Sequence, residues 1–220
     1  MWLIDLVLPH RCVACRTAAD ALCASCRARL RPLLPPLCNR CGAPTSWAVE
    51  RCRECAGRRL GFASARAAVV YAGPAVAFVH AWKERGRRRL APLAAELVLA
   101  QCERPAADVI TYIPPDRVRQ LERACHPAQS LAHELAARWG LACEPLLERT
   151  RVTKRQATLP LARRGGNVRN LFGATGAVVG RVLLVDDVYT TGATASAAAT
   201  ALRAGGAERV DVVTFARAVR

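Results

Sequence analysis

Two kinds of hydrophobic pattern alternate along the chain from residue 61 onward. Short apolar runs, often β-branched, are typical of strands buried on both faces, and longer stretches with an apolar stripe are typical of helices. We expect strands at residues 67–71, 109–113, 182–185 and 210–215, and helices at residues 75–84, 90–101, 127–139 and 193–204. Strands that alternate with helices in this way predict an α/β fold, with a mostly parallel sheet and helices on both of its faces.

The helical stripes also predict which side chains face the core. In the first helix we expect Val76 and Val79 on the inner face, with His80 packed rather than binding a ligand. The inner residues of the next two helices are expected to be Leu93, Leu97 and Ala100, and Leu131, Leu135 and Trp139. A short strand within residues 141–147, and a mobile basic loop over residues 151–169 that leads to a short hairpin, complete the pattern.

Residues 1–60 lack this periodicity and carry eight of the 11 cysteines instead. The eight form four Cys-x-x-Cys pairs: Cys12 and Cys15, Cys23 and Cys26, Cys38 and Cys41, and Cys52 and Cys55. Two such pairs complete one tetrahedral Cys₄ site, so the pattern predicts two structural Zn²⁺ ions. The regular repeat, without an export signal, favours zinc over a disulfide framework or a redox dithiol.

Sequential pairing of these motifs is preferred, because closing a short loop costs less chain entropy than closing a long one. Interleaved pairing, first with third and second with fourth, stays open. In either case the zinc stabilises a module that is too small for a core of its own, and no open catalytic coordination position is indicated. We therefore divide the chain into a double zinc-ribbon module, residues 1–60, and an α/β domain, residues 61–220.

The net charge of the chain indicates which class of ligand or partner it binds. The chain has 33 Lys and Arg residues against 17 Asp and Glu, a net charge of +16, and only Lys83 and Lys154 among the basic residues are lysine. Such an excess favours phosphorylated ligands or nucleic acid. Many of the arginines lie in the zinc module, where nucleic-acid or protein contact and a merely solvated basic surface are equally good interpretations.

No apolar stretch is long enough to span a membrane, and residues 2–8 lack the features of a secretory signal. We expect residues 2–8 to pack as a short helix. The expected location is the cytoplasm, with any membrane association made through partners.

A candidate ligand site follows the apolar run at residues 182–185. Two acids come first and a turn rich in hydroxyl groups comes next: Asp186, Asp187, Thr190, Thr191, Gly192, Ala193 and Thr194. Ligands of open α/β sheets bind at the carboxyl ends of strands, and a helix start favours a phosphate. Carboxylates repel phosphate, so we expect Asp186 and Asp187 to hold sugar hydroxyls or a divalent cation. The alternative, an Asp cap and a surface turn, accounts for only one Asp and one Thr.

This ordered motif resembles the phosphoribosyl pyrophosphate (PRPP) loop of type I phosphoribosyltransferases. The resemblance implies that Asp186 and Asp187 are catalytic and hold the ribose hydroxyls. It also implies that residues 190–194 cradle the 5′-phosphate and that Mg²⁺ binds together with PRPP. Basic loops in this fold receive the pyrophosphate, and the candidates for that role are Lys83, Arg87, Arg117 and Arg155. Ordinary basic loops, and a turn capped by Asp116, are the competing interpretations.

The double zinc ribbon, the Lys83-x-x-Gly86-Arg87 segment, the Gln156-to-Phe172 stretch and the acidic doublet together resemble the ComF family. That family is phosphoribosyltransferase-like and is associated with natural competence, the uptake of external DNA by bacteria. The implied activity is transfer of a phosphoribosyl group, a pentosyl transfer, to an acceptor that the sequence does not name.

One segment departs from the family pattern. Residues 123–127 read Arg-Ala-Cys-His-Pro, where ComF-like chains usually carry Arg-x-Phe-Asn-Gln. The departure leaves room for a second hypothesis, a non-catalytic protein that binds single-stranded DNA or competence proteins in the uptake machinery. The oligomeric state is not indicated.

Overall fold

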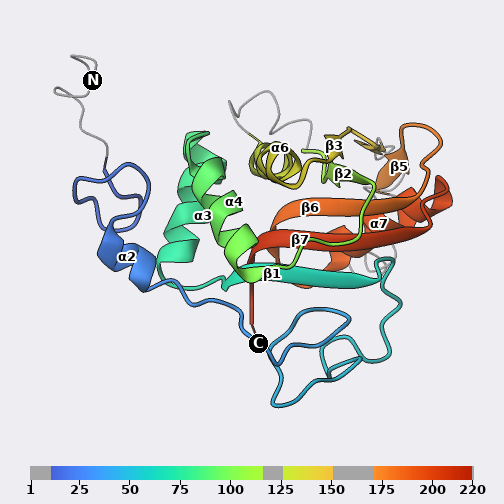
Figure 1. The fold of residues 1–220 in the computed structure, drawn as a ribbon, viewed down its shortest axis with the longest axis horizontal. Coiled ribbons are helices and arrows are strands. Elements are labelled where there is room, and N and C mark those ends of the chain that lie inside the picture. Colours follow the sequence, from blue (N-terminus) through green and yellow to red (C-terminus); the bar gives the residue numbers. More distant parts are fainter. Residues whose placement is uncertain (1–10, 116–125, 151–170, 220) are drawn as a thin grey trace, which may run out of the picture.

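The computed structural model describes residues 11–115, 126–150 and 171–219 (Figure 1). The predictions for residues 2–8, for Arg117, Arg155 and Gln156, and for the loop at residues 151–169 therefore lie outside the described residues.

A five-stranded sheet lies at the centre, with the strand order β1-β7-β6-β2-β3 and every neighbouring pair parallel. Its strands are β1 (Ser64–Val70), β2 (Val109–Tyr112), β3 (Ala142–Cys143), β6 (Arg181–Tyr189) and β7 (Arg209–Arg217). The predicted strands are confirmed, but β6 and β7 are longer than their apolar runs. Tyr189 at the end of β6 pairs with Arg217 at the end of β7.

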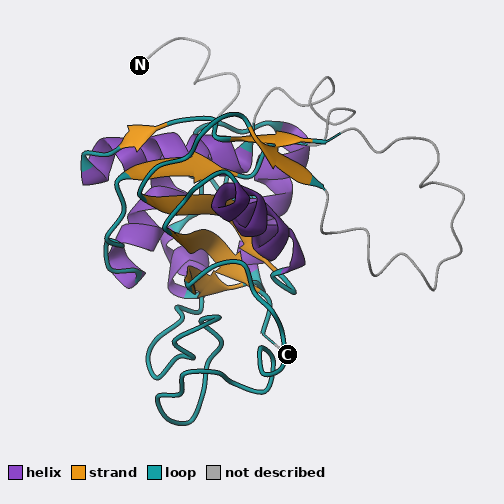
Figure 2. Cartoon of the chain, turned by 90° about the vertical axis from the view of Figure 1, so that its right-hand side faces the viewer, coloured by secondary structure: helices purple, strands orange, loops and turns teal. Residues whose placement is uncertain are grey.

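Helices cover both faces of this sheet, as Figure 2 shows. On one face lie α3 (Pro74–Arg85), α4 (Leu90–Gln101) and α6 (Pro127–Trp139), and on the other lies α7 (Ala193–Ala204). A small antiparallel hairpin of β4 (Leu147–Arg149) and β5 (Phe172–Ala174) packs beside α7. The mostly parallel α/β fold is therefore confirmed. No helix in the described part of the chain is both long and apolar enough to span a membrane.

The predicted inner faces of α3 and α4 are partly wrong. Val76 and His80 are exposed on α3, because Phe78 and Trp82 pack with Phe215 of β7 and take the core positions. On α4 the buried residues are Leu90, Ala91, Ala94, Ala95 and Val98. Small alanines let this helix approach the sheet closely, so Leu93 and Leu97 are only half-buried and Ala100 is exposed. The stripe of α6 is confirmed at Leu131 and Leu135, with Trp139 half-buried.

The expected hairpin also differs in place. The sequence interpretation put it after the basic loop, whereas β4 and β5 pair with one another from either side of residues 151–170. The pairing of Arg149 with Phe172 fixes this register.

The zinc-ribbon module is split across the sheet. Its first ribbon, which contains the short helix α2 (Ala24–Ala28), adds Val13, Ala21 and Leu30 to the core formed with α3, α4 and α6. Its second ribbon adds Cys38, Cys41, Ala43 and Cys55 to the core on the α7 face. The two ribbons thus pack on opposite faces.

Residues 31–33 connect the two ribbons along the outer edge of β1. The Leu33 N–H donates to the Ala68 carbonyl at 3.0 Å, and the Val70 N–H donates to the Arg31 carbonyl at 2.8 Å. Pro32 lies opposite Val69 in an antiparallel bridge. The connector therefore covers an edge strand whose backbone groups would otherwise face solvent.

Candidate functional site

The acidic doublet lies toward the carboxyl end of β6, the position at which open parallel sheets bind ligands. Asp187 is 7% exposed and Asp186 is half-buried. The Lys83 ammonium of α3 lies 2.8 Å from a carboxylate oxygen of Asp187. The structure therefore brings together two acids and one of the basic residues that the sequence placed in the same site.

Burial and the neighbouring charge of Asp187 raise the pKa of Asp186 to about 7. The Asp187 backbone N–H donates to the Asp186 carboxylate at 2.8 Å, and together with the charge of Lys83 it acts in the opposite direction. The Asp186 carboxyl can therefore release its proton near neutral pH, and its carboxylate can then bind a cation or accept hydrogen bonds from hydroxyl groups.

The threonine-rich turn joins β6 to α7. Gly192 is the N-cap of α7 at φ +73°, a left-handed conformation, and the helix has no side-chain cap hydrogen bond. The Thr191 hydroxyl accepts a hydrogen bond from the Ala193 N–H at 3.3 Å, while Thr190 is exposed and Thr194 half-buried. Because the N-cap residue is a glycine, no N-cap side chain covers the start of α7, and an anion can approach the N–H groups there.

The turn rests on Tyr189, which is buried. A Cβ atom added to Gly192 would lie 2.2 Å from the Tyr189 hydroxyl oxygen, so only glycine fits at this contact. The Tyr189 ring packs edge-on against Phe62, with centroids 6.2 Å apart. The shape of the turn therefore depends on the position of one aromatic side chain beneath it.

Arg149 belongs to the site region but was missed by the sequence interpretation. Its Nε donates to the Pro114 carbonyl at 2.9 Å, its guanidinium lies 5.0 Å from the Phe172 ring centroid, and its charge lowers the pKa of Asp186. Arg149 ties the hairpin to the end of β2. The position of Arg149 depends on the register of the β4–β5 pairing, which no local sequence motif predicts.

Of the other basic candidates, Arg87 is described by the structure and Arg117 and Arg155 are not. Arg87 donates to the Arg11 carbonyl at 3.4 Å, a contact with the first ribbon. Lys83 alone among the four candidates is seen against the acidic doublet in the described residues.

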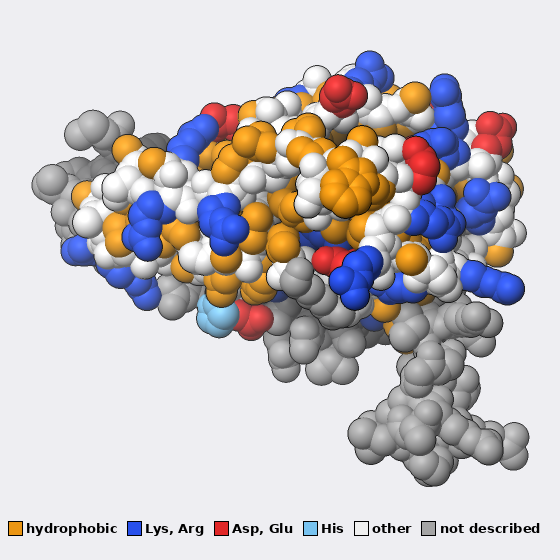
Figure 3. Space-filling model, turned by 90° about the horizontal axis from the view of Figure 1, so that it is seen from below, with side chains coloured by type: hydrophobic (Ala, Val, Ile, Leu, Met, Phe, Trp, Pro, Cys, Tyr) orange, Lys and Arg blue, Asp and Glu red, His pale blue; other side chains and the backbone are white. Residues whose placement is uncertain are grey.

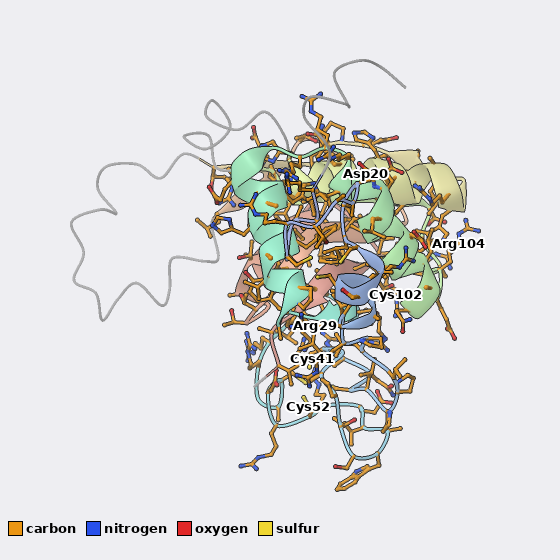
Figure 4. The ribbon with its side chains drawn as sticks, turned by 90° about the vertical axis from the view of Figure 1, so that its left-hand side faces the viewer. Asp20, Arg29, Cys41, Cys52, Cys102 and Arg104 are labelled. Atoms are coloured by element: carbon orange, nitrogen blue, oxygen red, sulfur yellow. The ribbon has the colours of Figure 1, made fainter. Side chains whose placement is uncertain are left out.

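The eight paired cysteines form two groups, Cys12, Cys15, Cys23 and Cys26, and Cys38, Cys41, Cys52 and Cys55. In each group the sulfur atoms all lie within 4.8 Å of one another. The Cys41–Cys52 and Cys38–Cys55 sulfur pairs are 3.5 and 3.6 Å apart, close to the roughly 3.8 Å that a tetrahedral Zn–S₄ centre requires. Sequential pairing is therefore confirmed, and both groups fit Zn²⁺. Figure 4 shows Cys41 and Cys52 in the loops below the sheet.

Two adjoining hollows, of about 590 and 500 Å³, lie between the second ribbon, the start of β1 and the carboxyl end of α7. They share Arg40 and Ala63, and we call them the arginine groove. The arginines that line it are Arg40, Arg51, Arg66, Arg203 and Arg209. Figure 3 views the molecule from the side on which the second ribbon lies, and shows basic side chains interleaved with hydrophobic ones.

Known proteins are similar to this chain in both its zinc-ribbon module and its α/β domain. Residues 3–56 match the family model described as a double zinc ribbon domain. The chain is 26% identical to competence protein F of Haemophilus influenzae, over 94% of this chain and 97% of the relative. The chain is similar to competence protein F along nearly its whole length. It is likewise 28% identical to the DNA utilization protein YhgH of Escherichia coli K12, over 94% of this chain and 96% of that one. The match to competence protein F takes in both the ribbons and the sheet.

Two solved structures are similar to part of this chain. A glutamine PRPP amidotransferase from B. subtilis, complexed with ADP and GMP, is 31% identical over 56% of this chain and 26% of its own, with a TM-score of 0.40. The protein TT1426 from Thermus thermophilus is 22% identical over 58% of this chain and 72% of its own, with a TM-score of 0.33.

Proposed function

We propose that the chain is a phosphoribosyltransferase-like protein that binds PRPP with Mg²⁺ and serves in the uptake or use of DNA. The observation that carries the proposal is the cluster at the end of β6, where Lys83 pairs with Asp187 and the acidic doublet is followed directly by the turn at residues 190–194. The relatives named competence protein F and DNA utilization protein support the biological setting.

Each part of the cluster suits one part of the ligand. The carboxylates of Asp186 and Asp187 would accept hydrogen bonds from the ribose hydroxyls, and the turn together with the start of α7 would receive the 5′-phosphate. Lys83 now neutralises Asp187, and on ligand binding its ammonium would turn to the pyrophosphate. When bound, Mg²⁺ would offset part of the pyrophosphate charge.

The chemistry that follows is displacement at the anomeric carbon. The bond from C1 to the pyrophosphate oxygen breaks, the electron pair leaves with pyrophosphate, and an acceptor nucleophile forms the new bond to C1. Positive charge develops on the ribose ring in the transition state. Two carboxylates fixed beside the ring would stabilise that charge without moving.

Calorimetric titration with PRPP and Mg²⁺ tests the proposal, with the wild type beside Asp187→Asn. Loss of a charged hydrogen-bond acceptor should weaken binding roughly 10- to 100-fold. Asp211→Asn is the matched control, because Asp211 is a carboxylate of similar burial on the neighbouring strand, bonded to Ser64 and Arg209 away from the turn. Undiminished affinity in Asp187→Asn would overturn the proposal.

The arginine groove favours a second candidate function, binding of single-stranded nucleic acid. Burial and the charges of Arg51, Arg209 and Arg203 lower the pKa of Arg40, which shows how closely these cations are gathered. Each phosphate contact releases counterions, so affinity should fall steeply with salt. Fluorescence anisotropy with a labelled oligonucleotide should give a salt slope that drops by about 1 in Arg203→Gln. A slope that does not change would remove the groove from consideration.

A further inference from the structure

Arg217 is an arginine buried where the sheet, the second zinc centre and the ligand turn meet. It ends β7, pairs with Tyr189 of β6, and is 1% exposed. An ionised side chain so deeply buried is costly unless other groups satisfy it. The contacts that satisfy the Arg217 guanidinium therefore indicate its structural role.

Two of these contacts reach the second ribbon. Arg217 Nη1 donates to the Cys41 carbonyl at 2.6 Å, and Nη2 donates to the Glu54 carboxylate at 2.7 Å. Nη2 also lies 3.7 Å from the Cys41 sulfur. Cys41 belongs to the second cysteine group, and Glu54 lies between two others of that group, Cys52 and Cys55. Arg217 thus holds one cysteine of that centre and the loop that carries two more.

A third contact reaches the ligand turn. The Arg217 guanidinium lies 4.4 Å from the Tyr189 ring centroid, a cation–π distance. Tyr189 supports Gly192, since its hydroxyl oxygen lies only 2.2 Å from the point that a Cβ on Gly192 would occupy. The contacts therefore run without a gap from Cys41 through Arg217 and Tyr189 to Gly192.

The position of Arg217 depends on zinc at the second centre, because the guanidinium offsets the negative charge of that centre. Four thiolates around one Zn²⁺ carry a net charge of about −2, and a neighbouring guanidinium offsets part of it. Without zinc the cysteines are no longer gathered by a shared cation, and the ribbon that supplies the Cys41 carbonyl and Glu54 loses its main constraint. Arg217 would then keep neither its partners nor its position over Tyr189.

We propose that Arg217 is a positioning residue that couples the second zinc centre to the turn at residues 190–194. Zinc bound at that centre keeps the turn in the conformation that binds the ligand. The inference rests on the proposed function only for the identity of the ligand. The first ribbon, by contrast, packs on the other face of the sheet, with α3, α4 and α6.

The test uses the full-length zinc-loaded protein and the variants Arg217→Lys and Arg217→Met. Two quantities are measured, the affinity for PRPP with Mg²⁺ and the hydrogen–deuterium exchange of residues 189–194. Loss of the planar guanidinium group should weaken PRPP binding roughly tenfold, which is a typical coupling between two sites. It should also speed hydrogen–deuterium exchange in the turn. Arg27→Met is the control for loss of an ion pair between ribbon and domain, because Arg27 of the first ribbon pairs with Glu96 of α4, where both side chains are exposed.

Tyr189→Leu covers the case in which the Arg217 variants lose zinc or fail to fold. It keeps Arg217 bound to Cys41 and Glu54 but removes the ring, so exchange at the turn should rise while zinc affinity, measured by competition with a zinc-selective chelator, stays at the wild-type value. Wild-type exchange in Arg217→Met or in Tyr189→Leu overturns the coupling. If the wild type does not bind PRPP but Arg217→Met still loosens the turn, the proposed function fails and the coupling stands.

Discussion

Gly192 is the residue at which the ligand turn is least tolerant of change. Its φ of +73° is a conformation that residues with a Cβ adopt only at a cost, and the Tyr189 hydroxyl lies where that Cβ would be. Both penalties apply to the same substitution. The conformation of the turn therefore requires the absence of a side chain at residue 192 as well as the presence of the threonines.

We predict that Gly192→Ala lowers the free energy of unfolding by about 2 kcal/mol or more, from backbone strain plus overlap with Tyr189. Gly176→Ala is the control, because a Cβ there meets nothing within 4 Å. Urea unfolding followed by circular dichroism measures both. Equal midpoints for the two variants would contradict the prediction.

Residues of the site differ in how far the sequence reveals them. Asp186, Asp187 and the turn at residues 190–194 are contiguous, so their chemistry can be recognised before any fold is known. Lys83 could be recognised only through a family-like segment. Arg149 and Arg217 could not be predicted, because each reaches its place through strand register and long-range packing that no local pattern encodes.

Among the elements, the two zinc ribbons differ in how well they protect their cysteines. In the first group Cys15 is exposed and Cys23 half-buried, while in the second only Cys52 is half-buried and the other three are buried. The second group is also held by Arg217. A chelator has easier access to the first group.

We therefore predict that a zinc-selective chelator removes zinc in two phases and that the faster phase comes from the first ribbon. A colorimetric zinc assay follows the release. Replacing Cys15 with Ser should abolish the fast phase and leave the slow one unchanged, whereas Arg217→Met should speed the slow phase only. Release in a single phase from the wild type would show that the two centres are equally protected.

Element types were easier to predict than the faces they bury. Apolar runs located all the longer strands, and the stripe of α6 was read correctly at Leu131 and Leu135. On α4 the expectation favoured Leu93 and Leu97 over the alanines, but Ala94 and Ala95 are the residues with no exposure. In an alanine-rich helix, close approach to the sheet decides the buried face, and side-chain hydrophobicity alone does not reveal it.

At the scale of the whole molecule, the ribbon module behaves as part of the domain that it flanks. Gly42 of the second ribbon lies so close to β1 that an added Cβ would meet the Ala65 carbonyl at 2.4 Å, and the Ala65 N–H donates to the Arg40 carbonyl at 3.0 Å. Division of the chain near residue 60 stays a prediction about sequence patterns. The packing argues that the two parts do not fold separately.

Accordingly, we predict that a fragment of residues 61–220 associates or unfolds, because Arg217 loses Cys41 and Glu54 and the edge of β1 is uncovered. A fragment of residues 31–220, which keeps the connector and the second ribbon, is the matched comparison and should remain closer to the full chain. Size-exclusion chromatography and thermal unfolding would report both. A monomeric 61–220 fragment with the melting temperature of the full chain would refute the argument.

The position of β7 has a consequence for how the protein is made. This strand comes after all the others in the chain, yet it lies between β1 and β6. While the ribosome is still at work, each ribbon can capture its metal from cysteines that are near neighbours in sequence. The two halves of the sheet, by contrast, wait for the last strand to emerge before they can be joined. Until then the backbone partners of β1 come from the ribbon module, namely residues 31–33 and the Arg40 carbonyl, so these contacts protect the edge of β1 in the nascent chain.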